Sequence, residues 1–113
     1  MKAFAERCGL HTPEREAALQ RLLQRLRDER IERVRFGWCD AHGMLRGKTL
    51  MAGAVESALR NGVGMVGTLM LKDSSDRTAW KVFEPGGTDD IPGFGGASNL
   101  LLLGDPDSLM ALP

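Results

Sequence analysis

The feature that most constrains the fold is a change in the period of the apolar residues near position 33. Before it, four leucines recur at the three- and four-residue spacing of one helix face: Leu19, Leu22, Leu23 and Leu26. After it, Val34, Phe36 and Trp38 alternate with polar or small residues, which is the period of a half-buried strand. A chain of 113 residues with both patterns has room for one modest core. We therefore expect a single α+β domain in which a helix packs against a mixed sheet.

The helix has a clear predicted start. Thr12 can cap it, and Pro13 suits its first position. Glu14 and Glu16 place negative charge at the positive end of the helix dipole. Its apolar stripe is too short for a coiled coil, which needs several sustained heptads. The stripe is therefore expected to pack inside its own domain.

Residues 33–50 are predicted to form a β-hairpin. The stretch Asp40-Ala41-His42-Gly43 contains residues that tolerate turn dihedrals, and residues 44–50 can return antiparallel to the first strand. His42 lies at the tip of this hairpin without a second ligand at metal spacing. It is therefore interpreted as a solvated turn residue.

Shorter elements follow the hairpin. In order, the pattern predicts a helix over 54–59 that closes at Asn61-Gly62, a strand over 65–71, a brief strand over 81–83, a loop over 84–98, a strand over 99–103, a turn over 105–108 and a terminal strand or edge over 109–112. The run over 65–71 is almost wholly apolar, so a short buried helix is the alternative there. Its length favours a strand.

Charge and cysteine usage exclude several classes of protein. Fifteen Lys and Arg residues balance fifteen Asp and Glu residues, so no net field favours nucleic acid or an anionic membrane. Cys8 and Cys39 lack metal-ligand spacing, and the N-terminus lacks the apolar stretch of a secretory signal. No apolar run approaches the ~20 residues that cross a bilayer. We expect a soluble, cytoplasmic protein with unbridged thiols that binds neither nucleic acid nor membrane.

The common catalytic and binding motifs are missing from the sequence. The glycines in Gly93-Phe94-Gly95-Gly96 precede an apolar strand rather than the helix N-terminus that a phosphate loop needs. Neither HExxH nor CxxC occurs, and no calcium-loop spacing is found. Ser74 and Ser75 have no base evident in the sequence, and Cys39 lies within a predicted strand. The chain therefore shows no self-sufficient active site.

The stretch KDSSDRTAW, residues 72–80, is the remaining polar cluster. Asp73 follows a buried run and is flanked by Lys72 and two hydroxyls. Such an aspartate could hold an ammonium or amine through charge-assisted hydrogen bonds and accept a proton as it reacts. The alternative is an Asx or Ser turn, in which the same side chains cap amides of their own loop. From the residues alone, the turn is the commoner arrangement.

Three stretches carry a family resemblance. The hairpin VRFGWCDAHGMLRGKTL is similar to a pattern of strand, Asp-x-x-Gly turn and Arg-Gly-Lys, with matches at Asp40, Gly43, Arg46, Gly47 and Lys48. A helix ending in Asn-Gly then leads to a strand that runs into KDSSDRTAW. The ending LLLLGDPDSLMALP is similar to Pro-Asp-x-x-Thr-x-x-x-x-Pro, with matches at Asp105, Ser108 and Pro113. In order and spacing over 31–113, these stretches resemble the N-terminal β-grasp domain of the glutamine synthetase family.

This resemblance implies a fold and an activity. The fold is a β-grasp (ubiquitin-like) domain over residues 31–113, preceded by an amphipathic helix in residues 1–30. The activity is that of an ATP-dependent ligase, which joins ammonia or an amine to the side-chain carboxylate of glutamate through an acyl phosphate. In that family a larger C-terminal domain holds ATP, Mg or Mn, and glutamate, so no cofactor is expected in this domain. A loop of the N-terminal domain completes the active site of a neighbouring subunit in a homo-oligomeric ring.

The loop of that family contains Asp-Gly-Ser-Ser, which falls here on Asp73, Ser74 and Ser75. The resemblance implies that Asp73 attracts ammonium and helps to deprotonate it, with the serines nearby. The glycine of the motif is missing, and the register can also slip to Asp76. The amine and the acid that are joined therefore stay open.

Two further matched residues, Arg46 and Lys48, lie on the returning strand of the hairpin. A solvated strand face and a role in subunit contact or anion attraction are both open for them. None of the family's Glu and His metal ligands is present, so we expect a domain of a longer enzyme that is inactive alone. The competing hypotheses are a non-enzymatic β-grasp module whose sheet edge recruits a partner, and a hydrolase with a base near Ser74 or Cys39.

Overall fold

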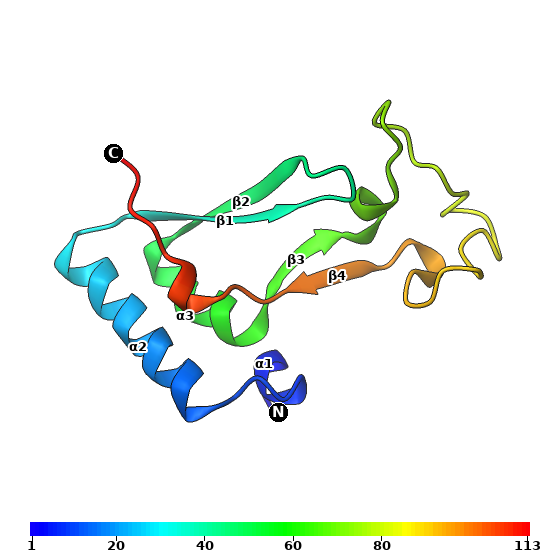
Figure 1. The fold of residues 1–113 in the computed structure, drawn as a ribbon. Coiled ribbons are helices and arrows are strands. Elements are labelled where there is room, and N and C mark those ends of the chain that lie inside the picture. Colours follow the sequence, from blue (N-terminus) through cyan, green and yellow to red (C-terminus); the bar gives the residue numbers. More distant parts are fainter. The chain divides into compact units, whose positions relative to one another are not determined.

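The computed structural model describes the backbone of residues 1–113 and every side chain except that of Ala97. Figure 1 traces its helices and strands, which occur in the order α1 (Phe4–Arg7), α2 (Pro13–Asp28), β1 (Arg33–Cys39), β2 (Leu45–Met51), α3 (Ala52–Asn61), β3 (Val63–Val66) and β4 (Asn99–Leu102). Three short 3₁₀ helices cover Gly67–Leu71, Gly95–Ala97 and Pro106–Ser108. The predicted α+β class is confirmed.

The chain divides into two compact units. The first unit comprises Met1–Phe36, Lys48–Val63 and Leu102–Pro113. The second unit comprises Gly37–Gly47 and Gly64–Leu101.

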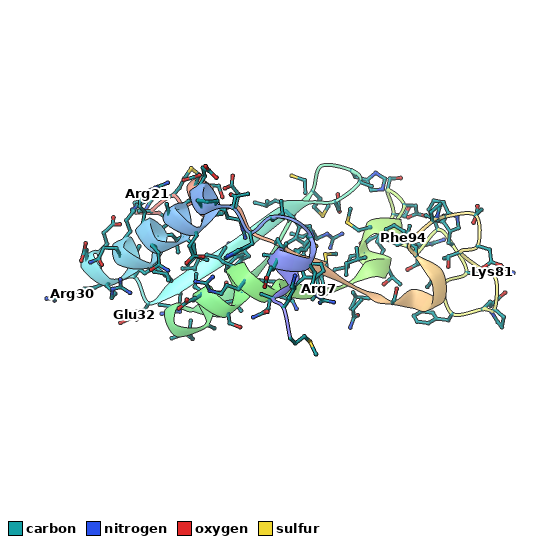
Figure 2. All side chains as sticks on the ribbon, turned by 90° about the horizontal axis from the view of Figure 1, so that it is seen from below. Arg7, Arg21, Arg30, Glu32, Lys81 and Phe94 are labelled. Atoms are coloured by element: carbon teal, nitrogen blue, oxygen red, sulfur yellow. The ribbon has the colours of Figure 1, made fainter. Side chains whose placement is uncertain are left out.

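The core of the first unit forms between α2 and α3. Three leucines of the α2 stripe are buried as predicted, while Leu23 is partly buried and packs against them. The three join two residues of α3 in one cluster: Leu19, Leu22, Leu26, Val55 and Leu59. Each buried side chain of this size stabilises the fold by roughly 1.5–3 kcal/mol relative to exposure. Charged residues on and just after α2, including Arg21, Arg30 and Glu32, project outward (Figure 2).

The start of α2 and the end of α3 follow the predicted chemistry. The hydroxyl of Thr12 accepts a hydrogen bond from the backbone amide of Arg15 at 3.1 Å, which confirms the predicted cap of α2. The guanidinium of Arg15 donates to the carbonyls of Gly104, at 3.0 Å, and Leu59, at 2.8 Å. It thereby links α2 to the end of α3 and to the C-terminal segment of the same unit. The predicted end of α3 at Asn61 is also confirmed.

The predicted hairpin is confirmed as β1 and β2. Burial alternates along β1, with Val34, Phe36 and Trp38 more buried than their neighbours. The turn contains Gly43 at φ 75°, a conformation that glycine adopts without strain. The amide of Gly43 donates to the carbonyl of Asp40 at 3.0 Å and closes the turn.

The strand predicted over 65–71 is wrong beyond Val66. There β3 ends and the 3₁₀ helix Gly67–Leu71 begins. Gly67 donates its amide to the carbonyl of Ser98 at 3.2 Å, and a Cβ at this glycine would lie 2.5 Å from that oxygen. Since β4 begins only at Asn99, no strand lies opposite the residues that follow Val66. The ladder of backbone hydrogen bonds between β3 and β4 therefore ends there.

Two other predicted strands are also wrong. The segment 81–83 forms local turns, in which Val82 donates to the carbonyl of Trp80 and Glu84 to that of Lys81. Residues 109–112 form no strand, and Leu109 instead packs against the core of the first unit. The short helix α1 was not predicted. The loop over 84–98 and the strand near 99–103 are confirmed in outline, as is the turn over 105–108.

The sheet differs from the expected one. Within the described backbone, β1 pairs with β2 and β3 pairs with β4, giving two antiparallel two-stranded sheets. The single mixed sheet of a β-grasp is therefore not observed. The physical reason is that three segments expected to supply strands form no strand. The backbone hydrogen bonds of 67–71 and 81–83 are made in a 3₁₀ helix and in local turns, and residues 109–112 pack as irregular chain.

Candidate functional site

The turn between β1 and β2 is organised around one buried carboxylate. Asp40 is buried, and its Oδ1 accepts hydrogen bonds from the amides of His42 and Met44, both at 2.9 Å. Its Oδ2 accepts from Nε of Arg46 at 3.1 Å. Burial raises the pKa of Asp40, but the two amides and the guanidinium together hold that pKa below its ordinary value of 3.8. The residue is therefore ionised, and it raises the pKa of Arg46 in turn.

The loop of residues 72–78 is a tight turn closed by an antiparallel bridge between Lys72 and Thr78. Oδ1 of Asp73 accepts from the amides of Ser75, at 2.8 Å, and Arg77, at 3.0 Å. The amide of Asp73 donates to the carbonyl of Arg77 at 2.7 Å. This is the Asx-type turn that the sequence offered as one of two interpretations of the loop.

The rest of the Asp73 carboxylate is available for other partners. The residue is half-buried, and within the described residues its Oδ2 makes no hydrogen bond. Ser74 and Ser75 are exposed beside it in the same loop. An Asx turn and a second role for the same carboxylate are therefore compatible, because the turn occupies only one of its two oxygens.

The loop and the hairpin turn belong to the same unit and are joined by side chains. Nη2 of Arg46 lies 3.3 Å from Oδ1 of Asp76, and Nε2 of His42 donates to the carbonyl of Lys72 at 2.7 Å. Lys72 donates through Nζ to the carbonyl of Asp76 at 3.3 Å. Arg46 thus joins Asp40 to Asp76. His42, interpreted from the sequence as a solvated turn residue, is exposed but also holds the loop.

Of the site residues predicted from the sequence, the structure brings together Arg46 and the loop that contains Asp73, Ser74 and Ser75. Lys48 is an exposed residue of β2 in the first unit. Sequence reasoning missed the pairing of Arg46 with Asp76. Thirty positions separate these two residues in the chain, so no local spacing could have indicated it.

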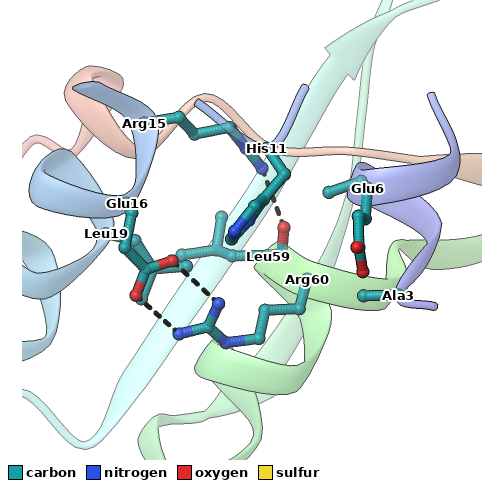
Figure 3. Close-up of a pocket in the computed structure, with 9 residues that line it drawn as sticks. Ala3, Glu6, His11, Arg15, Glu16, Leu19, Leu59 and Arg60 are labelled. Atoms are coloured by element: carbon teal, nitrogen blue, oxygen red, sulfur yellow. Dashed lines mark hydrogen bonds and ion pairs between the residues drawn. The ribbon is translucent and has the colours of Figure 1, made fainter. Parts of the chain in front are cut away.

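A second polar feature lies in the first unit, around a cavity of about 20 Å³ (Figure 3). There Glu16 accepts two hydrogen bonds from Arg60, each at 2.8 Å, and Arg15 reaches the carbonyl of Leu59. These bonds with Arg60, together with one from the side chain of Gln20, lower the pKa of Glu16 from 4.5 to about 2. Since the cavity has room for about one water molecule, it is a structural site rather than a substrate pocket.

No group of three or more His, Cys, Asp or Glu side chains converges as a metal site in the part of the chain that the structure describes. Within the same residues, no helix is both long and apolar enough to span a bilayer.

Comparison with known proteins gives a distant relative. The chain is 27% identical to gamma-glutamylanilide synthase from Acinetobacter sp over 116 aligned residues. The alignment covers 97% of this chain but only 23% of that protein, so the chain spans less than a quarter of its relative's length. No protein-family profile matches the chain. The relative is a glutamine synthetase-like enzyme, and the resemblance noted in the sequence is confirmed at this level. The chain is therefore a distant relative, over almost its whole length, of a glutamine synthetase-like ligase.

Proposed function

We propose that this chain is the N-terminal, β-grasp-related region of a ligase that joins ammonia or an amine to the side-chain carboxylate of glutamate at the expense of ATP. The observation that carries the proposal is the alignment with gamma-glutamylanilide synthase over 97% of the chain. That relative's name also suggests an aromatic amine such as aniline as the nucleophile to test first. Alone, the chain is expected to be inactive.

The reaction has two steps. The carboxylate of glutamate attacks the terminal phosphorus of ATP and ADP leaves, which gives an acyl phosphate. The nitrogen lone pair of the amine then attacks the acyl carbon, phosphate leaves with the electrons of the C–O bond, and the nitrogen loses one proton. A carboxylate beside the nitrogen favours this step, because it attracts the cationic ammonium and accepts the proton.

In this proposal Asp73 supplies that carboxylate to the active site of a neighbouring subunit. Its Oδ1 is fixed by two amides of its own loop, so Oδ2 has a defined direction without being occupied. The exposed hydroxyls of Ser74 and Ser75, in the same loop, are further groups that an amine can contact. As the resemblance to the glutamine synthetase family implies, the proposal assigns the binding of Mg or Mn, and of ATP, to the larger C-terminal domain of the enzyme.

The test uses the enzyme expressed from the complete reading frame that contains this chain. ADP release that depends on both glutamate and an amine is measured for the wild type and for Asp73→Ala. We expect Asp73→Ala to lower amine transfer about 10²–10⁴-fold, the usual contribution of a positioned proton acceptor, while ATP affinity stays unchanged. The matched control is Asp90→Ala, an exposed aspartate of the same unit.

Two experimental outcomes would each contradict a part of this proposal. Full activity of Asp73→Ala from pH 6 to pH 9 would remove the role of Asp73. A reading frame that stops at Pro113, with no ligase activity, would favour the second candidate, a non-enzymatic interaction module. The exposed Val66 and Leu101 on β3 and β4, in a sheet of only two strands, are the observation that favours this alternative.

A further inference from the structure

We infer that Arg46 is a positioning residue, which clamps the loop of residues 72–78 to the hairpin turn and so sets the direction of Asp73. This inference rests on the proposed function only in so far as Asp73 meets a substrate; the clamp itself is a statement about this chain. It concerns the second unit alone, since both the turn and the loop belong to it.

The clamp has a fixed end. Oδ2 of Asp40 accepts from Nε of Arg46, and Oδ1 of the same carboxylate is held by the amides of His42 and Met44. Three donors therefore converge on one buried carboxylate in a turn between two strands. The side chains of Arg46 and Asp40 are 23% and 3% exposed, so this ion pair is screened less than one on an open surface.

The other end of the clamp holds the loop. Nη2 of Arg46 reaches Oδ1 of Asp76, and Asp76 has φ 62°, a left-handed conformation that is uncommon for residues other than glycine. A guanidinium can serve two carboxylates at once because its donors diverge in one plane, whereas the ammonium of lysine is a compact point charge. The second link, from His42 to the carbonyl of Lys72, restrains the loop at its other edge.

The clamp also gives different roles to Asp73 and Asp76, the two aspartates that the sequence left as alternatives for the catalytic position. Asp76 is engaged by Arg46, while Asp73 forms no ion pair within the described residues and keeps Oδ2 unoccupied. Asp76 is therefore the anchor of the loop and Asp73 the residue that it presents. Arg46 affects Asp73 only through the loop, since it contacts Asp76 and Asp40 rather than Asp73.

The first test measures amide exchange by NMR on this chain. The probes are the amides of Ser75 and Arg77, which donate to Asp73. Asp76→Asn should speed their exchange about threefold, as expected for a largely exposed ion pair, and Arg46→Gln should speed it about tenfold. Arg46→Lys should not restore protection. The control is Arg77→Gln, which removes a charge from the loop without touching the clamp and should leave the protection of Ser75 unchanged.

Asp76→Asn also keeps the test decisive if Arg46→Gln fails to fold. It leaves the pair of Asp40 and Arg46 intact, and asparagine tolerates the left-handed backbone at this position. If Asp76→Asn and Arg46→Gln both keep wild-type exchange at Ser75 and Arg77, the clamp does not exist. This result would leave the proposed function standing.

The second test measures activity in the enzyme expressed from the complete reading frame. Arg46→Gln should raise the KM for the amine and lower the rate of amine transfer, with the KM for ATP unchanged. In an Asp73→Ala background the same change should have no further effect, because Arg46 acts through Asp73. Additive losses in the double variant would overturn the inference. Absence of ligase activity in the wild type would overturn the proposed function, while the exchange result still decides the clamp.

Discussion

The two units of this chain are stabilised in different ways. The first unit buries the leucines of α2 against Val55 and Leu59 of α3, so its core is apolar. In the second unit Met65, Leu71 and Val82 are buried, but so are Asp40, Thr68 and Thr88. Among the described residues, every buried polar side chain belongs to the second unit.

This difference connects stability to the proposed function. An apolar core is non-directional and tolerates small rearrangements, whereas hydrogen bonds fix groups at defined distances and angles. The proposed function, in which the loop presents a carboxylate to another subunit, requires the second kind of support. The two units should therefore respond differently to substitution, and the following predictions test this from the largest effect to the smallest.

The largest effect is expected in the core of the first unit. Leu59 is 2% exposed, and Leu59→Ala should lower the free energy of unfolding by ~2–5 kcal/mol through lost burial and an unfilled cavity. Urea denaturation followed by circular dichroism measures this change. Leu45→Ala is the control, because Leu45 is 71% exposed and its loss should cost less than ~0.5 kcal/mol. Equal losses in both variants would contradict an apolar core at this place.

The next effect is expected at Asp40 in the second unit. Asp40→Ala leaves the amides of His42 and Met44 and the guanidinium of Arg46 without their acceptor, so the thermal midpoint should fall clearly, though less than in Leu59→Ala. Asp40→Asn keeps an oxygen for both amides and should lose only part of this stability. If the two variants are equally unstable, the amide bonds contribute nothing and the ion pair alone matters.

Acid stability should depend on Glu16 in the first unit. Its pKa is lowered from 4.5 to about 2 by its hydrogen bonds with Arg60 and Gln20. Because the folded pKa lies below the unfolded one, the stabilisation is fully present above about pH 4.5 and is lost as the pH falls towards 2. Glu16→Gln should cost about 1 kcal/mol at pH 7 and flatten this dependence in urea titrations. Glu14→Gln, an exposed neighbour on the same helix, should keep the wild-type profile.

The smallest effect is expected at the pair of Arg21 and Asp107. Nη2 of Arg21 lies 3.2 Å from Oδ1 of Asp107, but the two side chains are 65% and 69% exposed. Arg21→Gln should change the free energy of unfolding by less than ~0.5 kcal/mol, and 1 M salt should abolish the difference. A loss above 1 kcal/mol would show that surface charge, as well as the apolar core, holds the first unit together.

How well the structure could be predicted from the sequence depends on how close in the chain the interacting residues lie, and errors occur in both units: α1 and residues 109–112 belong to the first unit. The helix α2, its cap at Thr12, the hairpin and the end of α3 were all predicted, because each depends on residues close together in the chain. The segments 67–71 and 81–83 were predicted wrongly in the second unit. Their apolar character indicated burial correctly for Leu71 and Val82, but not the backbone conformation, which depends on the chain that passes alongside.

For the candidate site, the sequence identified the loop and both aspartates but could not choose between them. The Asx turn at Asp73 uses amides two and four residues away, so it was foreseeable as an alternative. The engagement of Asp76 by Arg46 was not, because it joins two segments far apart in the chain. Whether Asp73 acts on a substrate stays a prediction.

By itself, the sequence determined the helices α2 and α3, the hairpin and the turn residues of this protein, since dihedral preferences and apolar periods act over a few positions. It also contained enough of the family's order and spacing for a distant relation to be recognised. Only the tertiary structure decided where strands stop, that the strands form two small sheets, and which aspartate is held by Arg46. These outcomes depend on hydrogen bonds and ion pairs between residues remote in sequence, and such pairs form only when the chain folds and brings those residues together.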